Sequence, residues 1–413
     1  MTPAMWSLLA LLLVIAGSLT SRINVGVLAV ALAWPIAIFA AGWKADAVMA
    51  TFPSSLFLTL VGVSVLFGVA QANGTMAAVT HSTVRLLRGR SSALPLLFFS
   101  LACVLSTAGP GAISATALMA PIAMGIAVRA EMSVLLAALM VGNGANAGNL
   151  SPVSAVGMIV HSSMAKVGLV GHVWNVWAAN FTAHALAAVL AWLLFGGPAL
   201  RHAQHAGEDT VTMAMTRRHW ATLAVIAGWI GAVVAFKVNP GLSAFAAASV
   251  LILASLGNDE QTMKAVPWSV IVMVCGVSVL IGVLEKTGGM DLFTTLLAQV
   301  ATPKTVNGAI AGITGLISTY SSTSGVVYPA FLPAVPGLVA KLGGGDPMQV
   351  ALSINVGAAI VDVSPLSTIG ALCIAALPEG QDAKLLFRRL LLWGFSMTIG
   401  GALFCQLFIR FFA

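Results

Sequence analysis

The sequence predicts an all-α polytopic membrane protein made of two inverted five-helix repeats, each with a re-entrant helical hairpin and a broken membrane helix. The first observation behind this prediction is composition. Of 413 residues, 59% are hydrophobic and 8% are charged, whereas globular domains carry about a quarter charged residues. The apolar runs are mostly long enough for membrane helices, since about 20 residues span roughly 30 Å of hydrocarbon. They also lack the alternation of barrel strands.

Ten apolar segments are predicted to span the membrane. The first is interpreted as a helix rather than a signal peptide, because no basic residue precedes it and no A-x-A site follows it. In chain order the ten segments are 4–20, 23–42, 54–72, 132–165, 172–197, 217–237, 240–256, 267–285, 347–378 and 384–411.

Two further apolar stretches, 93–128 and 303–340, are interrupted near their middles by small, polar or helix-breaking residues. The first interruption reads STAGPG from Ser106, and the second reads STYSSTSG from Ser318. Because a backbone turn inside the membrane is tolerated only where protein or water satisfies it, we predict that each stretch is a hairpin that enters the membrane and turns back.

The second observation is internal repetition. GVSVLFGVAQANGTM from Gly62 and GVSVLIGVLEKTGGM from Gly276 agree at nine of fifteen positions, where chance in so biased a composition gives roughly two. The small residues of these strings have helix-packing spacing, so we interpret GVSVL as a packing surface. GANAGNLSPVSAVG from Gly144 matches GAAIVDVSPLSTIG from Gly357 at six of fourteen. The shared positions include the polar and helix-breaking residues.

The repeat predicts the domain boundaries. A first repeat covers 1–197, the polar stretch 198–216 is a cytoplasmic linker, and a second repeat covers 217–413. Five crossings per half is an odd number, so the second copy is predicted to be inverted. Twelve of the 19 Lys and Arg residues then fall on one side. The positive-inside rule makes that side cytoplasmic and places both termini outside the cell.

The third observation is that the helix breaks recur at matched positions of the two halves. Paired interruptions are typical of transporter sites, because half-helix N-termini present N–H groups to an anion while freed carbonyls can hold a cation. No Lys or Arg falls inside a predicted membrane core. A bound carboxylate would therefore be held by hydroxyls, amides and helix ends. Such neutral donors compensate a dianion poorly, which favours a co-bound cation.

The motifs NGANAGNLSP, VDVSPLSTIG and YSSTSGVVYPAFLPAVPG resemble those of MatC-type malonate and dicarboxylate carriers, within the ion transporter superfamily that includes divalent anion/sodium symporters. The resemblance covers nearly the whole chain. It implies secondary transport of a small dicarboxylate such as malonate, malate or succinate, with coupling to Na⁺ or H⁺. It also implies a homodimer and an elevator-like motion, here in the inner membrane of a bacterium among membrane lipids.

In sodium-coupled relatives, a Ser-Asn-Thr tip on each hairpin binds substrate carboxylates and helps to hold Na⁺. This chain keeps Ser321-Ser322-Thr323 at the second tip but has Gly109-Pro110-Gly111 at the first. The first tip therefore lacks the sodium-binding motif of the relatives. The candidate substrate-binding residues are Ser106, Thr107, Gly109, Gly111, Asn146, Asn149, Ser151, Ser321, Ser322, Thr323, Ser364 and Ser367. The candidate ligands of the coupling ion, with Na⁺ the only metal expected, are Asn143, Asn146, Ser321, Thr323 and Asp362.

Asp362 is the one carboxylate in a predicted helix break, and its counterpart in the first half is Asn149. An intramembrane acid is a functional hypothesis by default, as an ion ligand or a proton carrier. The alternative is that its carboxylate caps the following half-helix. His161 and His184 could relay protons, but hydrogen bonding near helix ends is the favoured interpretation.

Other function classes remain as alternatives. The chain has no GxSG, HExxH or P-loop sequence, so an enzyme or a directly ATP-driven pump is disfavoured, and no organic cofactor or nucleic acid partner is expected. The four cysteines lie in apolar runs without CxxC spacing and are predicted to be free thiols. The remaining alternatives are a passive channel, a cation/proton antiporter of the same superfamily, and the membrane subunit of a tripartite transporter served by a soluble binding protein.

Overall fold

The computed structural model describes residues 1–20, 23–85, 91–197, 214–236, 238–378 and 380–413. Within these ranges the regular structure is helical throughout, without a strand. This confirms the all-α prediction. Most of the linker 198–216 lies outside the described residues.

The first half contains helices α1 to α10, including two hairpin arms and two halves of a broken helix. Their bounds are α1 Pro3–Thr20, α2 Val25–Pro35 with a π-helical turn Ile36–Ala40, α3 Ala45–Met49, α4 Ser54–Ala72, α5 Thr75–Arg85, a 3-10 turn Ser91–Ala93, α6 Leu94–Thr107, α7 Gly111–Arg129, α8 Val134–Gly148, α9 Ala155–Lys166 and α10 Val173–Leu194.

The second half repeats this order from α11 to α21. The bounds are α11 Arg217–Phe236, α12 Pro240–Leu253, α13 Asp259–Ala265, α14 Trp268–Lys286, α15 Gly289–Ala298, α16 Val306–Tyr320, a π-helical turn Thr323–Val327, α17 Tyr328–Phe331, a 3-10 turn Leu332–Ala334, α18 Val335–Leu342, α19 Pro347–Ala359, α20 Thr368–Ala375 and α21 Ala383–Phe408 with a 3-10 turn Ile409–Phe411.

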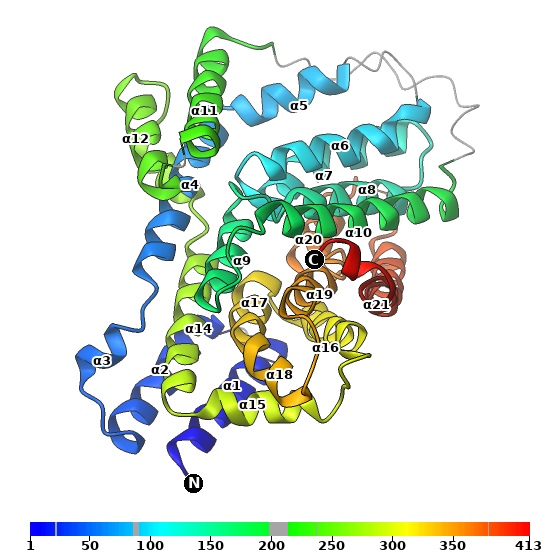
Figure 1. Ribbon diagram of the computed structural model, residues 1–413. Coiled ribbons are helices and arrows are strands. Elements are labelled where there is room, and N and C mark those ends of the chain that lie inside the picture. The colour runs from blue at the N-terminus through cyan, green and yellow to red at the C-terminus, as the bar shows by residue number, and fades with distance from the viewer. Residues whose placement is uncertain (21–22, 86–90, 198–213, 237, 379) are drawn as a thin grey trace.

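Corresponding helices of the two halves pack in corresponding ways. In the first half α4 packs on α12, α6 on α8, and α8 on α10; in the second half α14 packs on α2, α16 on α19, and α19 on α21. Figure 1 shows α5 and α15, the equivalent short helices, at opposite ends of the molecule. The matched order and contacts are those that a repeat requires, and the inverted orientation in a membrane stays a prediction.

The repeated GVSVL strings lie at two equivalent helix crossings. A Cβ atom on Gly62 of α4 would come 2.3 Å from the Gly241 carbonyl oxygen of α12, and one on Gly276 of α14 would come 2.2 Å from the Gly26 carbonyl oxygen of α2. Only glycine permits so close an approach of two backbones. The structure therefore confirms that these strings form packing surfaces.

The predicted hairpins and breaks are present as helical interruptions. The first hairpin consists of α6 and α7, which are in contact, with residues 108–110 between them; the second turns at residues 321–322 after α16. The segments 132–165 and 347–378 are each divided into two helices, with breaks at 149–154 and 360–367.

Six of the described helical segments are long and apolar enough to cross a membrane: 54–72, 111–129, 173–194, 268–286, 323–342 and 383–411. Two of these, 111–129 and 323–342, are the second arms of the hairpins. Their length alone would allow a full crossing, so the prediction that they turn back rests on the interruptions. A multi-pass membrane protein is the architecture that these helices support.

Candidate functional site

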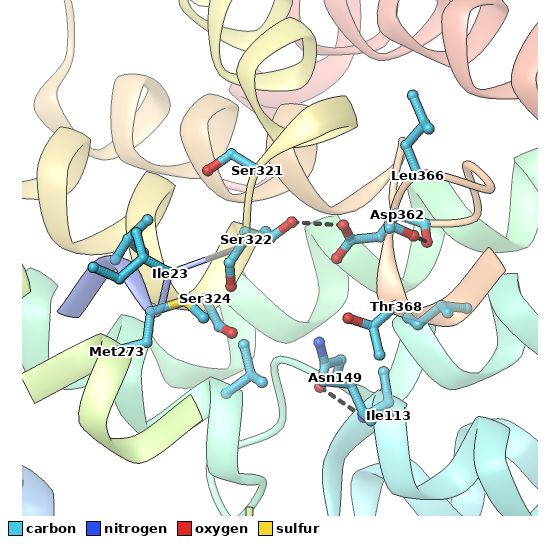
Figure 2. A pocket seen from close by; sticks show the side chains of 16 residues that line it. Ile23, Ile113, Asn149, Met273, Ser321, Ser322, Ser324, Asp362, Leu366 and Thr368 are labelled. Atoms are coloured by element: carbon cyan, nitrogen blue, oxygen red, sulfur yellow. Dashed lines mark hydrogen bonds between the residues drawn. The ribbon is translucent and has the colours of Figure 1, made fainter. Parts of the chain in front are cut away.

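A cavity of about 210 Å³ lies where the second hairpin tip, both helix breaks and the first residues of α7 meet. Figure 2 shows Ser324, Asn149, Thr368 and Asp362 around this space. Its remaining walls come from α2 and the residues before it, and from Met273 of α14. The cavity is lined by Ile23, Val25, Ala112, Ile113, Asn149, Val156, Met273, Ser321, Ser322, Thr323, Ser324, Asp362, Leu366, Ser367, Thr368 and Ile369.

Four helical segments begin at this cavity. They are α7, α9, the π-helical turn Thr323–Val327 and α20, and each contributes a residue of its first turn to the lining. The first N–H groups of a helix have no partner within the helix, and the helix dipole makes this end partially positive. The arrangement therefore provides an electropositive site without a basic side chain.

In the first half, side chains of the break bind the hairpin backbone. The amide oxygen Oδ1 of Asn149 accepts a hydrogen bond from the Ala112 N–H at 2.9 Å, and the Ser151 hydroxyl donates to the Thr107 carbonyl at 2.7 Å. The Ala155 N–H donates to the Gly109 carbonyl at 3.1 Å. These three bonds fix the start of α7 beside the start of α9.

In the second half, the equivalent contact involves a carboxylate and a hydroxyl. The Thr323 hydroxyl donates to Oδ1 of Asp362 at 2.6 Å, and Ser318 and Thr323 form a further hydroxyl–hydroxyl hydrogen bond. The Ser322 side chain accepts from the Gly325 N–H at 3.0 Å and so caps the π-helical turn. Two hydroxyl groups in series therefore lead from α16 to the Asp362 carboxylate.

The break after Asp362 is closed by Ser367. Its hydroxyl donates to the Asp362 backbone carbonyl and accepts from the Gly370 N–H at 3.5 Å as the N-cap of α20. The capping alternative for the Asp362 carboxylate is therefore not what the structure shows. The carboxylate bonds to the hairpin tip, and the neighbouring serine caps the helix.

Asp362 is the only ionisable side chain among the described residues that line the cavity. Leu366 and Thr368 are exposed, so the cavity is open along this edge. The cavity therefore contains two kinds of binding group. The helix N-termini favour an anion, and the carboxylate favours a cation or a proton.

Six of the residues predicted from the sequence line the cavity: Asn149, Ser321, Ser322, Thr323, Asp362 and Ser367. The others lie outside its lining, namely Ser106, Thr107, Gly109, Gly111, Asn143, Asn146, Ser151 and Ser364. Gly111 lies beside it, since a Cβ atom there would come 3.4 Å from Oδ1 of Asn149.

Asn143 and Asn146 lie in a separate buried polar cluster between α8 and α10. Asn143 donates to the Leu139 carbonyl and bonds through Oδ1 to Nδ1 of His184 at 3.1 Å. Asn180 donates to the Asn146 carbonyl at 2.7 Å. His184 is thus hydrogen-bonded, as the favoured interpretation expected, but it lies in the middle of α10 and not near a helix end.

Ser324 and Thr368 line the cavity but were not among the predicted site residues. Both directly follow predicted ones, Thr323 and Ser367, at the start of a helical segment. The signal available in the sequence was this position, because the N–H groups without an intrahelical partner belong to the first turn of a helix.

The comparisons with known proteins agree with this architecture. The fold is similar to that of the YdaH transporter of Alcanivorax borkumensis, a crystal structure described as revealing an unusual topology, with a TM-score of 0.62, 17% identity, and coverage of 100% of this chain and 99% of that chain. The chain thus has the fold of this polytopic membrane protein.

A second comparison, with a family model, concerns the first part of the chain. Residues 1–149 match the family model described as the dicarboxylate carrier protein MatC N-terminus, which confirms the resemblance to MatC-type carriers over this region. Both the family and the structural neighbour are transporters rather than enzymes. No curated protein matches the sequence.

Proposed function

We propose that the chain is a secondary active transporter of small dicarboxylates, coupled to Na⁺ or H⁺, with its substrate site in the cavity between the two helix breaks. The observation that carries this proposal is the meeting of four helical N-termini with a single carboxylate. The match of residues 1–149 to a dicarboxylate carrier family supplies the substrate class.

The size of the cavity suits a small substrate. Its volume of about 210 Å³ corresponds to roughly seven water molecules at about 30 Å³ each. A short dicarboxylate can place its two charges against different helix ends in such a space. The uncharged hydroxyls of Ser322, Ser324 and Thr368 would donate charge-assisted hydrogen bonds to the carboxylate oxygens of the substrate.

The position of Asp362 gives a physical reason for coupling. A bound dianion would share the cavity with this carboxylate, and two like charges about 6 Å apart repel by roughly 3 kcal/mol at an effective dielectric constant of 20. A Na⁺ on the carboxylate and the Thr323 hydroxyl, or a proton on the carboxylate, removes that repulsion. Binding of substrate and cation would therefore be mutually favourable, which is the linkage that symport requires.

Alternating access would move the hairpins and breaks against the remaining helices. The two hairpin and break units contact each other, since α7 packs on α20 and α9 packs on α17. We expect these units to move as one body, in the elevator manner implied by the family resemblance, within a homodimer.

Uptake by liposomes that contain only the purified chain tests the proposal. A panel of dicarboxylates under imposed Na⁺ or H⁺ gradients should show accumulation of short dicarboxylates, driven by one of the two gradients. Uptake that appears only after a soluble binding protein is added would favour the tripartite alternative. No dicarboxylate uptake in either case would refute the proposal.

Cysteine labelling tests the proposed inversion. Gln261, in the short helix α13 Asp259–Ala265, should label from the cytoplasm, and Gly344, after the second hairpin, should label from outside. Labelling of both positions from the same side would exclude the inverted repeat without bearing on the substrate.

A further inference from the structure

The repeated string differs between the two halves at a single position, and that position contacts the first hairpin tip. GVSVLFGV, residues 62–69, has Phe67 where GVSVLIGV, residues 276–283, has Ile281. Phe67 is 4% exposed. A Cβ atom on Gly109 would come 2.0 Å from Cε2 of the Phe67 ring, so α4 touches the tip that joins α6 to α7 (Figure 1). The ring therefore fills the space that a side chain at this tip would need.

The backbone of the first tip also requires glycine at this contact. Gly109 has a φ of 147°, a conformation that other residues rarely adopt. Its carbonyl accepts the Ala155 N–H at 3.1 Å, which holds the tip beside the start of α9. The second tip differs, because its residues 321–323 line the substrate cavity. The glycine of the first tip and the phenylalanine of α4 thus belong to one contact that the second half lacks.

On the α4 side the Phe67 ring has a support of its own. Phe67 and Trp229 of α11 form an edge-to-face pair with centroids 6.0 Å apart. The Trp229 indole N–H donates to the Pro240 carbonyl at 3.2 Å and to the Ser243 hydroxyl at 3.1 Å, both in α12, which also packs on α4. Phe67 is therefore held by α11 and α12 independently of the hairpin tip.

A second, much smaller cavity lies between α4 and the first hairpin. Its volume is about 30 Å³, which holds about one water molecule, against about 210 Å³ for the substrate cavity. Phe67 and Gln71 of α4 and Pro110 of the tip are among its lining residues. Gln71 is exposed, so this space begins near the surface and narrows toward the Phe67 ring. A dicarboxylate does not fit in it.

The two cavities lie on opposite faces of the first turns of α7. Ala112 and Ile113 line the substrate cavity, whereas Ser114 and Leu118 line the small one. Successive positions of a helix are rotated by about 100°, which places these two pairs about half a turn apart. The start of α7, together with the tip before it, therefore separates the substrate cavity from the space beside α4.

We infer that the Phe67 ring is a seal that closes the substrate cavity on the α4 side, and that each transport cycle parts this ring from the first tip. The inference rests on the proposed transport function, since alternating access needs two routes to one site. In this structure the cavity has an exposed edge at Leu366 and Thr368, and the small cavity is the closed remnant of the other route. An apolar ring against a glycine backbone excludes water, and no hydrogen bond has to break when the two separate.

Labelling of an added cysteine tests the seal without any substrate. Ser114→Cys places a thiol in the small cavity of the full-length protein in detergent, where a water-soluble maleimide should react with it slowly. Phe67→Ile gives α4 the residue that α14 has at the aligned position, and it should raise this labelling rate about tenfold, the size expected for the loss of one aromatic contact. Leu366→Cys, at the exposed edge of the substrate cavity, is the matched control and should label at the same rate with either residue at position 67. The four native cysteines are buried and should contribute little.

A reversible bridge tests whether the seal has to part. Phe67→Cys with Pro110→Cys, joined by a short bifunctional reagent through disulfides, should lower dicarboxylate uptake into liposomes to background, and reduction should restore it. Phe67→Cys with Trp229→Cys joins the same position to α11 and should keep its uptake when bridged.

Undiminished uptake by the bridged pair at positions 67 and 110 would overturn the inference. So would equal labelling rates of Ser114→Cys with Phe67 present and with Phe67→Ile. Absence of dicarboxylate uptake by the wild type would overturn the proposed function instead, and the labelling rates, which need no substrate, would still decide on the seal.

Discussion

The two helix breaks share one framework but differ in chemistry. Residue 149 of the first break and residue 362 of the second each accept a hydrogen bond from the start of their own hairpin's second arm. In the first half a neutral amide binds a backbone N–H of α7. In the second half a carboxylate binds the hydroxyl of Thr323, which is bonded in turn to Ser318.

This difference assigns separate tasks to the two halves. The first break is satisfied by bonds to backbone groups and carries no charge, so it can hold one end of the site rigid. The second break places a charge and two hydroxyl groups at the cavity, where an ion or a proton can bind and leave. Substitutions of packing and capping residues should therefore lower stability alike in both halves. Substitutions that change the ion-binding groups should alter transport only in the second half.

The largest effect is expected from Asp362→Asn, which gives the second break the side chain of the first. Accumulation of a dicarboxylate under an imposed gradient should fall to background, because no charge remains for the coupling cation to neutralise. Exchange of labelled for unlabelled substrate should persist, since exchange needs no net release of the ion. The measurement is accumulation and counterflow in liposomes at several pH values and Na⁺ concentrations.

The matched control for this substitution is Asp382→Asn. Asp382 caps α21 through the Leu385 N–H and lies outside the cavity lining. Asparagine caps a helix about as well as aspartate, so this variant removes one carboxylate and should keep both the stability and the coupling of the wild type. Wild-type ion dependence in Asp362→Asn would show that Asp362 does not bind the coupling ion. The ligands of that ion would then be carbonyls and hydroxyls of the breaks.

The framework could be predicted from the sequence because its signals are local. Clusters of glycine, proline and small polar residues favour helix breaks, so the segments around Pro110, Pro152 and Pro365 marked the first hairpin and both breaks. The second hairpin turn was predicted from the cluster after Ser318, and its observed position at 321–322 lies inside that cluster. Their repetition in the two halves also predicted the matched order of helices.

The lining of the cavity could not be predicted as completely. Ser106 and Ser151 lie in the predicted interruptions but are fully or almost fully buried outside the cavity, and the Ser151 hydroxyl binds a backbone carbonyl instead. Helices that are apolar on all sides give no periodic signal for the face that a residue occupies. Which side of a break faces the cavity is decided by packing between segments distant in sequence, such as α7 against α20.

The framework itself is tested by Gly144→Ala and Gly357→Ala, two positions that the repeat aligns. An added Cβ would lie 2.2 Å from the Phe99 carbonyl oxygen in the first case and 2.5 Å from Cα of Ala311 in the second. Both substitutions force a hairpin arm away from its broken helix, so each should cost about 1–3 kcal/mol of stability. Thermal unfolding in detergent measures this cost, with Gly228→Ala as the control because it has open space around it. A large effect in one half alone would contradict the shared framework.

A smaller effect is expected from Thr323→Val, which keeps the shape of the side chain and removes the donor to Asp362. An acceptor left without its partner in a desolvated site costs about 1–3 kcal/mol, so the cation dependence of transport should shift by about tenfold. Thr323→Ser keeps the hydroxyl and should behave as the wild type does. Unchanged cation dependence in Thr323→Val would remove the hydroxyl pair from the coupling site.

The smallest effect is expected at one pair of serines, where a loss of stability can be told apart from a loss of substrate affinity. Ser154 and Ser367 occupy equivalent N-caps: each accepts an N–H three residues ahead and donates to the backbone carbonyl of the residue aligned at 149 or 362. Ser154→Ala and Ser367→Ala should therefore each cost about 1 kcal/mol of stability. Only Ser367 lines the cavity, and only there would the loss of the cap also disturb the carboxylate beside the substrate.

The apparent substrate affinity of Ser367→Ala should thus fall severalfold while that of Ser154→Ala stays unchanged, as measured by initial uptake rates over a range of dicarboxylate concentrations. Equal losses of affinity in both variants would mean that the first break contacts the substrate as directly as the second, and the division of tasks between the halves would fail.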